Sequence, residues 1–134
     1  LLESGSSTLI SEVAVKNISH FKKINILAIT LDNYILSHAT PTVIKIDAEG
    51  AESGIIDGGA DLFRKYNPLV LMEVWRGING QQFSKKAVDK LTQLGYVIYQ
   101  IGVDGDLIPV SWSQIENDIH YNLGANFVFK KNHK

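Results

Sequence analysis

Apolar residues in this chain alternate between short continuous runs and segments of helical spacing. β-branched residues occupy four of the five positions in 42–46, and a second apolar run covers 69–75. The first run predicts a strand buried on both faces of a parallel sheet, because such strands carry few polar positions. Between the runs, apolar positions in 51–66 share one helical face, although the glycine pair at 58–59 weakens the middle of that helix. A strand, a helix and a second strand are therefore expected here.

The N-terminal part of the chain has weaker patterns. Residues 1–8 are rich in serine and glycine and predict a loop or a frayed end. The short apolar run at 24–29 predicts a strand. The residues that follow predict a short helix over 30–36, with Thr30 or Asp32 as its N-cap.

The C-terminal half continues the alternation of helical and extended patterns. The expected elements are a helix over 83–94 ended by Gly95, strands over 96–101 and 125–130, a turn at 104–105 and a helix that starts in a capping box at Ser111 and Gln114. Alternating strands and helices predict one α/β domain, or part of one, with right-handed crossovers and at least three neighbouring strands.

The composition narrows the classes of function. The 134 residues include 13 basic and 14 acidic side chains, so the formal charge is −1, and the sequence contains no cysteine. Near-neutral charge removes the electrostatic case for nucleic acid or anionic lipid as a partner. The lack of cysteine excludes disulfides, thiolate catalysis and thiolate-ligated metals. Because we find no signal peptide and no apolar run of the roughly 18–20 residues that span a bilayer, we expect a cytoplasmic protein without a membrane partner.

Acidic residues gather where the strand predicted at 42–46 is expected to end. Asp47 follows that strand, Glu49 and Gly50 lie in the turn, and Glu52 falls in the first turn of the next helix. Ligands of open α/β sheets sit at the carboxyl ends of strands, and glycine lets the backbone approach a ligand closely. Carboxylates so close together repel one another unless a cation, hydrogen-bond donors or a helix N-terminus offsets them. This turn is therefore a candidate site for an ammonium group, a hydroxyl proton or a divalent cation.

The strand predicted at 69–75 also carries an acid near its end. Glu73 lies there, and Trp75 follows it. Helix capping is an alternative explanation for Glu49 and Glu52, because the helix macrodipole favours acids in the first turn. Capping explains Asp47 less well, since a carboxylate at the end of an apolar strand is desolvated without a partner.

Four segments carry motifs in a fixed order. They read Ile-Thr-Leu-Asp-Asn-Tyr-Ile at 29–35, Ile-Lys-Ile-Asp-Ala-Glu-Gly-Ala-Glu at 44–52, Ile-Ile-Asp-Gly-Gly at 55–59 and Pro-Leu-Val-Leu-Met-Glu-Val at 68–74. In this order and at these separations, the segments resemble the FkbM family of methyltransferases. The dipeptide at 104–105 and the closing 126–128 also look like the end of that family's domain, so 1–134 resembles the C-terminal part of a single FkbM-like domain.

The resemblance implies an S-adenosylmethionine-dependent methyltransferase with a Rossmann-like class I fold. Its partner would be a small molecule, a sugar or natural product that accepts the methyl group on a hydroxyl. At the matching positions, Asp47 and Gly50 are implied in cofactor binding, and Asp47 or Glu49 in accepting the hydroxyl proton. The residues implied on the acceptor side are Glu52, Glu73 and Trp75.

The resemblance also implies an incomplete fold. The family pattern begins with a strand, a glycine-rich turn for the cofactor's methionine end and an acid for its ribose, and this sequence does not carry them. We therefore expect the acceptor half of the domain, with weak or no binding of S-adenosylmethionine and no activity of this fragment alone. The strand at 42–46 would become a sheet edge, which 24–29 or a second copy of the chain would cover. Association into a homo-oligomer through this edge is therefore expected.

Two other classes of function stay open. A non-catalytic Rossmann-like interaction module, or a truncated remnant, would keep the fold without the chemistry. A divalent-metal site on Asp47, Glu49 and Glu52 would serve phosphoryl or hydrolytic chemistry, because hard cations prefer clustered carboxylates. The family resemblance implies no metal.

Overall fold

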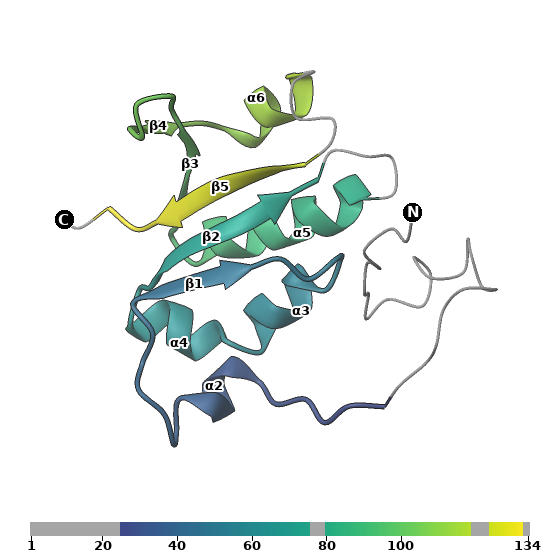
Figure 1. Cartoon of the computed structure of the whole chain (residues 1–134), viewed down its shortest axis with the longest axis vertical. Coiled ribbons are helices and arrows are strands. Elements are labelled where there is room, and N and C mark those ends of the chain that lie inside the picture. Colours follow the sequence, from purple (N-terminus) through teal and green to yellow (C-terminus); the bar gives the residue numbers. More distant parts are fainter. Residues whose placement is uncertain (1–24, 76–79, 119–123, 133–134) are drawn as a thin grey trace, which may run out of the picture.

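The computed structural model describes residues 25–75, 80–118 and 124–132, so the loop predicted at 1–8 lies outside the described residues. Within them the chain forms a mixed α/β fold in which helices pack on a five-stranded sheet (Figure 1). The strands are β1 (Val43–Ile46), β2 (Leu69–Val74), β3 (Val97–Ile101), β4 (Leu107–Pro109) and β5 (Ala125–Lys130). The helices are α2 (Leu31–Tyr34), α3 (Glu52–Asp57), α4 (Ala60–Lys65), α5 (Gly80–Gln93) and α6 (Trp112–Asn117). No helix in these segments combines the length and the apolar character needed to cross a bilayer.

The sheet has the strand order β1-β2-β5-β3-β4. β1 and β2 are parallel, with Ile46 beside Met72, and α3 and α4 connect them. β5 runs antiparallel to both β2 and β3, and β4 closes a hairpin with β3. The predicted strand–helix–strand unit is therefore present. The third predicted strand, β3, is separated from β2 by the last strand of the chain.

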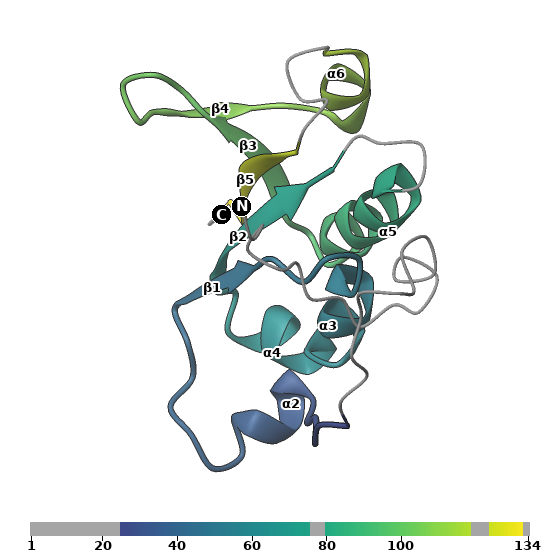
Figure 2. The same ribbon diagram turned by 45° about the vertical axis from the view of Figure 1, so that its right-hand side comes forward.

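The core lies between one face of the sheet and the helices. Alternate residues of β2 (Val70, Met72 and Val74) are fully buried, and the residues between them are half-buried. Phe127 and Phe129 of β5 pair with β2 on the same buried face. Figure 2 shows α3, α4 and α5 on one side of the sheet. Strand alternation thus separates a helix-covered face from a more open one.

Side-chain caps start the first helices. The hydroxyl of Thr30 accepts a hydrogen bond from Asn33 N at 3.2 Å, so Thr30 is the predicted N-cap of α2. The carboxylate of Asp32, the other predicted cap, accepts hydrogen bonds from Asp61 N at 3.2 Å and Leu62 N at 2.8 Å. Asp32 therefore caps α4, a helix far along the chain, and this contact ties α2 to α4.

The predicted boundaries of the C-terminal elements are largely confirmed. Gly95 follows α5 with φ 90°, the left-handed conformation that favours glycine. The predicted capping box at the start of α6 is present: Ser111 Oγ accepts from Gln114 N at 3.4 Å, and Gln114 Oε1 accepts from Ser111 N at 2.8 Å.

The predicted helix over 51–66 is two helices, α3 and α4, which meet at Gly58 and Gly59. A Cβ atom on Gly59 would lie 2.9 Å from Leu31 Cδ1 and 3.0 Å from the ring of Phe63. The glycine pair therefore does more than weaken a helix. It lets α2 pack closely against the point where the two helices join.

Two predictions about strands are wrong. The described part of the 24–29 run forms no strand, and Ile26 and Leu27 are 67% and 95% exposed. A short apolar run of this kind forms a strand only where a neighbouring strand supplies hydrogen bonds. β1 is not buried on both faces either, because it lies at the edge of the sheet and Val43 is 59% exposed. The expectation that 42–46 forms a sheet edge is confirmed for the described residues.

Candidate functional site

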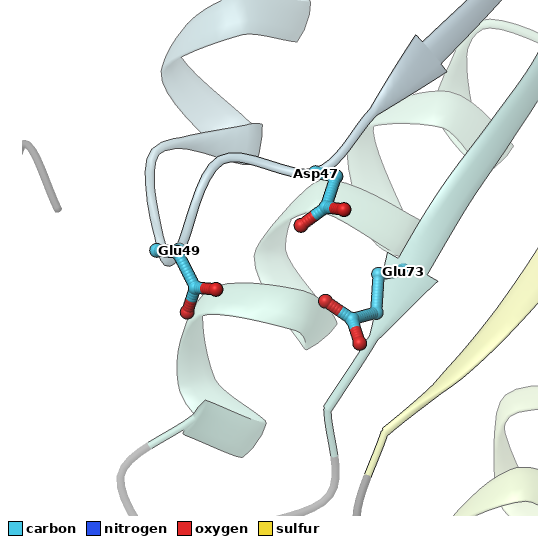
Figure 3. A group of neighbouring side chains, drawn as sticks. All are labelled: Asp47, Glu49 and Glu73. Carbon is cyan, nitrogen blue, oxygen red and sulfur yellow. The ribbon is translucent and has the colours of Figure 1, made fainter. Parts of the chain in front are cut away.

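Three carboxylates from two neighbouring strands meet at one end of the sheet. Asp47 follows β1, Glu49 lies in the next loop, and Glu73 is close to the end of β2. Because β1 and β2 run parallel, their carboxyl ends lie at the same edge. One carboxylate oxygen from each residue lies within 4.8 Å of the others, and Figure 3 shows the side chains directed toward one another. We call Asp47, Glu49 and Glu73 the acidic edge.

The loop that carries Glu49 has an unusual backbone. Glu49 has φ 49° and Gly50 has φ 101°, both in the left-handed region that side chains disfavour. The buried Glu52 holds this loop, because its Oε1 accepts hydrogen bonds from Ala48 N and Gly50 N at 3.1 Å each. The carboxylate of Glu52 is therefore engaged by backbone, and Glu73 takes the third place in the acid cluster that the sequence suggested for Glu52.

Lys45 fixes the protonation of Asp47. The two residues are separated by one position, so their side chains leave β1 on the same side. Lys45 Nζ donates a hydrogen bond to Asp47 Oδ2 at 2.9 Å. This bond and the attraction between the two charges hold the pKa of Asp47 below its ordinary value and raise the pKa of Lys45. Asp47 therefore holds a proton less readily than a carboxylate in water does.

Glu49 has the opposite electrostatic character. Burial raises its pKa, and the negative charges of Glu73, Asp47 and Glu52 raise it further. Glu49 therefore holds a proton more readily than a carboxylate in water does. The two acids that the sequence left as competing proton acceptors thus differ in their affinity for a proton.

Trp75 and Glu73 share a crowded corner of the acidic edge. A Cβ atom on Gly124, which has φ 88°, would lie 3.1 Å from Glu73 Oε1 and 3.4 Å from Trp75 Cδ1. Trp75 N donates a hydrogen bond to the hydroxyl of the buried Ser84 in α5 at 2.8 Å. Trp75 itself remains 40% exposed. Its position at the rim of the acidic edge is therefore fixed through its backbone.

Sequence reasoning missed three residues of this region. Lys45 had a usable signal, because the spacing of Lys45 and Asp47 on a strand predicts that the two side chains lie side by side. Ser84 and Gly124 had none, since they reach the acidic edge from α5 and from the residue before β5. Their contacts depend on the order of strands in the sheet, which the local sequence does not determine.

Two cavities on the described surface lie away from the acidic edge. One is located where β1 and β2 begin, and the other is lined by residues of α2 and α4. The acidic edge is itself partly open to solvent, since the side chain of Asp47 is 40% exposed.

A family model described as the methyltransferase FkbM domain matches residues 2–98 of the 134. The chain belongs to the FkbM methyltransferase family. The matched part contains β1, β2 and the whole acidic edge of this FkbM domain, whereas β4, α6 and β5 follow it. No curated protein and no solved structure matched the chain.

Proposed function

We propose that this FkbM domain uses S-adenosylmethionine to methylate a hydroxyl group of a sugar or natural product. The acidic edge carries the proposal, because acids from two parallel strands and one loop converge inside the family match. Ligands of open α/β sheets lie at the carboxyl ends of such strands. Membership of the family supports methyl transfer as the reaction.

The chemistry of the acidic edge suits the charged groups of this cofactor. S-adenosylmethionine carries an ammonium and a sulfonium group, and carboxylates stabilise nearby cations. Asp47 stays ionised and accepts one bond from Lys45, while each carboxylate oxygen can accept more than one. We assign Asp47 to the ammonium group, and Gly50 to the place where the absence of a side chain allows close approach. When bound, the cofactor supplies a methyl group on sulfur that is already activated for transfer.

Glu49 is our candidate for the general base. A base works best when its pKa lies near the working pH, and the pKa of Glu49 is raised while that of Asp47 is lowered. During transfer, the proton of the acceptor hydroxyl passes to the carboxylate of Glu49. The acceptor oxygen must also be held in line with the methyl group and protected from water.

The acceptor side is assigned to residues next to this base. The exposed indole of Trp75 offers an apolar surface for one face of a sugar ring. Glu73 offers hydrogen-bond acceptors for neighbouring hydroxyl groups. Because the carboxylate of Glu52 is engaged by Ala48 and Gly50, we assign Glu52 a positioning role through the loop.

The test measures transfer of a labelled methyl group from S-adenosylmethionine to a panel of sugars and polyols. The cofactor is supplied at millimolar concentration, because weak binding is expected from the sequence. We expect Glu49→Gln to slow transfer at least about a hundredfold, the usual contribution of a general base. Lys86→Gln, an exposed change on α5, is the control and should keep the wild-type rate. Equal rates for Glu49→Gln and wild type would overturn the assignment of Glu49. Labelled product would overturn the sequence-based expectation that this chain alone is inactive, and no labelled product from any acceptor would overturn the proposed reaction for this chain.

The free edge of the sheet supports a second proposal, the association of two copies. β1 pairs only with β2 in the described segments, and Val43 exposes an apolar side chain there. Unpaired edge strands favour pairing with another chain. We expect light scattering to give a dimer mass that Val43→Lys converts to a monomer mass, and a wild-type monomer at all concentrations would contradict this. A dimer without methyl transfer would favour the alternative function, a non-catalytic interaction module.

A further inference from the structure

A positive charge lies beside the acidic edge, on the side chain of Lys45. Its Nζ donates a hydrogen bond to Asp47 Oδ2 at 2.9 Å. The bond and charge of Asp47, and more weakly the charge of Glu73, raise the pKa of Lys45. The side chains of Lys45 and Asp47 are 58% and 40% exposed. A lasting cation and an anion are therefore side by side where a ligand from solvent can contact both.

The ammonium group of Lys45 has room for a second partner. It carries three N–H donors, and among the described residues the hydrogen bond to Asp47 uses one of them. The residue beside Lys45 on β2 is Leu71, whose apolar side chain accepts no hydrogen bond. The remaining donors of Lys45 are therefore available to an anionic group of a ligand.

The amino-acid end of S-adenosylmethionine has two opposite charges on one carbon atom. Its ammonium group is the cation that we assign to Asp47, and its carboxylate is attached to the same carbon. Binding of the ammonium group therefore also holds the carboxylate near the acidic edge. Because like charges repel, Glu49 and Glu73 oppose this part of the ligand unless a cation offsets their charge.

We propose that Lys45 binds the carboxylate of this amino-acid group while Asp47 binds its ammonium. The inference rests on the proposed function, because it takes S-adenosylmethionine as the ligand. The Lys45–Asp47 pair presents opposite charges that are joined at 2.9 Å, so each charge of the ligand meets an opposite charge of the protein. Charge-assisted hydrogen bonds of this kind are stronger than neutral ones. Lys45 thereby makes the site selective for an amino acid over an amine that lacks a carboxylate.

The alternative role of Lys45 is to hold Asp47 in place without contacting the ligand. Removal of Lys45 would then weaken the binding of an amino acid and of a matching amine to the same degree. If Lys45 binds the carboxylate, its removal weakens the amino acid more. The two roles are therefore distinguished by a ratio of affinities.

The test titrates two ligands that differ by one group into the full chain. One is S-adenosylmethionine, and the other is its decarboxylated form, which keeps the ammonium, sulfonium and adenosine groups. NMR follows the carboxyl carbon of Asp47 and the ε-carbon of Lys45 at about 0.15 M salt, where distant charges are screened. We expect both ligands to shift the Asp47 signal. S-adenosylmethionine should shift the Lys45 signal more than the decarboxylated form does.

The deciding quantity is the ratio of the two dissociation constants, because changes in Asp47 that affect both ligands equally cancel in it. In Lys45→Gln we expect this ratio to move about two- to fivefold against S-adenosylmethionine, the range for an exposed ion pair. Lys45→Arg keeps a cationic donor and should restore most of the wild-type ratio. Lys86→Gln, a change at an exposed lysine of α5, should leave the ratio unchanged.

Each result decides between the role of Lys45 and the cofactor site as a whole. An unchanged ratio in Lys45→Gln, with both ligands still bound, would overturn the role of Lys45 and leave the cofactor site in place. An Asp47 signal that neither ligand shifts would overturn the assignments of both residues. Methyl transfer is measured separately, so labelled product together with an unchanged ratio would reject this inference and retain the proposed reaction.

Discussion

The two ends of the sheet gather charge in different ways. At the acidic edge, like charges lie together because a loop of unusual backbone follows β1 and a parallel neighbour ends beside it. At the other end, two lysines that follow one another, Lys130 and Lys131, are held separately by aromatic rings and a helix carbonyl from distant parts of the chain. The first site depends on local backbone conformation and the second on long-range packing. Changes to the loop should therefore affect only the acidic edge, and changes to the aromatic rings only the two lysines.

The largest effect on stability is expected from Glu52→Ala. The change leaves the N–H groups of Ala48 and Gly50 without their acceptor, and each lost buried partner costs about 1–3 kcal/mol. We expect the free energy of unfolding in urea to fall by about 2–3 kcal/mol. The acidic edge should lose its order, while the contacts of Lys130 and Lys131 at the other end of the sheet should persist.

Glu52→Gln is the matched control for that change. Its amide oxygen can accept the same two hydrogen bonds, so most of the stability should return. A Glu52→Ala protein as stable as wild type would show that the loop does not need this side chain.

The next effect is a gain in stability from Glu49→Gly. The left-handed φ of Glu49 costs a non-glycine residue about 1–2 kcal/mol, from which the greater flexibility of unfolded glycine subtracts about 0.5–1 kcal/mol. We expect a net rise in the free energy of unfolding of up to about 1.5 kcal/mol, together with loss of methyl transfer. Glu49→Gln keeps the left-handed φ and its cost in free energy. It should therefore gain no stability from a change in backbone strain. A destabilised Glu49→Gly would show that the loop is relaxed with glutamate.

The contrast between the two ends explains how much the sequence could predict. Asp47 and Glu73 follow or end apolar runs, and parallel strands bring such positions to one edge, so the candidate site was predictable. The direction of Glu52 was not, because spacing places it in a helical turn without showing that its side chain turns back to the loop. The cavity at the other end of the sheet joins 67 and 69 to 130–132, and these segments share no motif.

The same reasoning applies to the fold. Most strands and helices were predictable, since their apolar periodicity is a local property. The strand predicted at 24–29 failed because a strand also needs a partner, and partners are set by the order of strands in the whole sheet. For that reason the position of β5 between β2 and β3 could not be predicted from the sequence either.

An effect of comparable size is expected at the other end of the sheet from Tyr99→Phe. It removes the hydrogen bond to Asn132 Oδ1 and keeps the ring below Lys130. We expect a loss of about 0.5–1.5 kcal/mol, the usual net value of one hydrogen bond, and altered amide signals of Asn132. Chemical shifts around Asp47 and Glu49 should not change. If they do, the two ends are coupled through the sheet.

The smallest effects concern pH, because partly exposed charges are screened. The lowered pKa of Asp47 adds stability that is present above its ordinary value of 3.8 and is lost as the pH falls through the lowered value. The raised pKa of Glu49 removes stability as the pH rises from its ordinary value of 4.5 through the raised one. Near neutral pH, Asp47→Asn should therefore be less stable than wild type and Glu49→Gln more stable.

Urea unfolding over the acidic to neutral range checks both signs. The difference in stability between Glu49→Gln and wild type should vanish below the ordinary pKa of glutamate. The difference between Asp47→Asn and wild type should vanish only at still lower pH. Identical pH profiles for the two variants would contradict the opposite electrostatic characters of Asp47 and Glu49.

The most direct test compares the two ends of the sheet in one titration. S-adenosylmethionine is added up to millimolar concentration while NMR follows the side-chain carboxyl carbons of Asp47, Glu49 and Glu73, with the amides of Asn67 and Asn132 as internal controls. We predict saturable shifts of the three carboxyl signals and unchanged amide signals. Carboxyl signals that stay unchanged throughout, or shifts confined to the amides, would contradict the assignment of the acidic edge as the cofactor site.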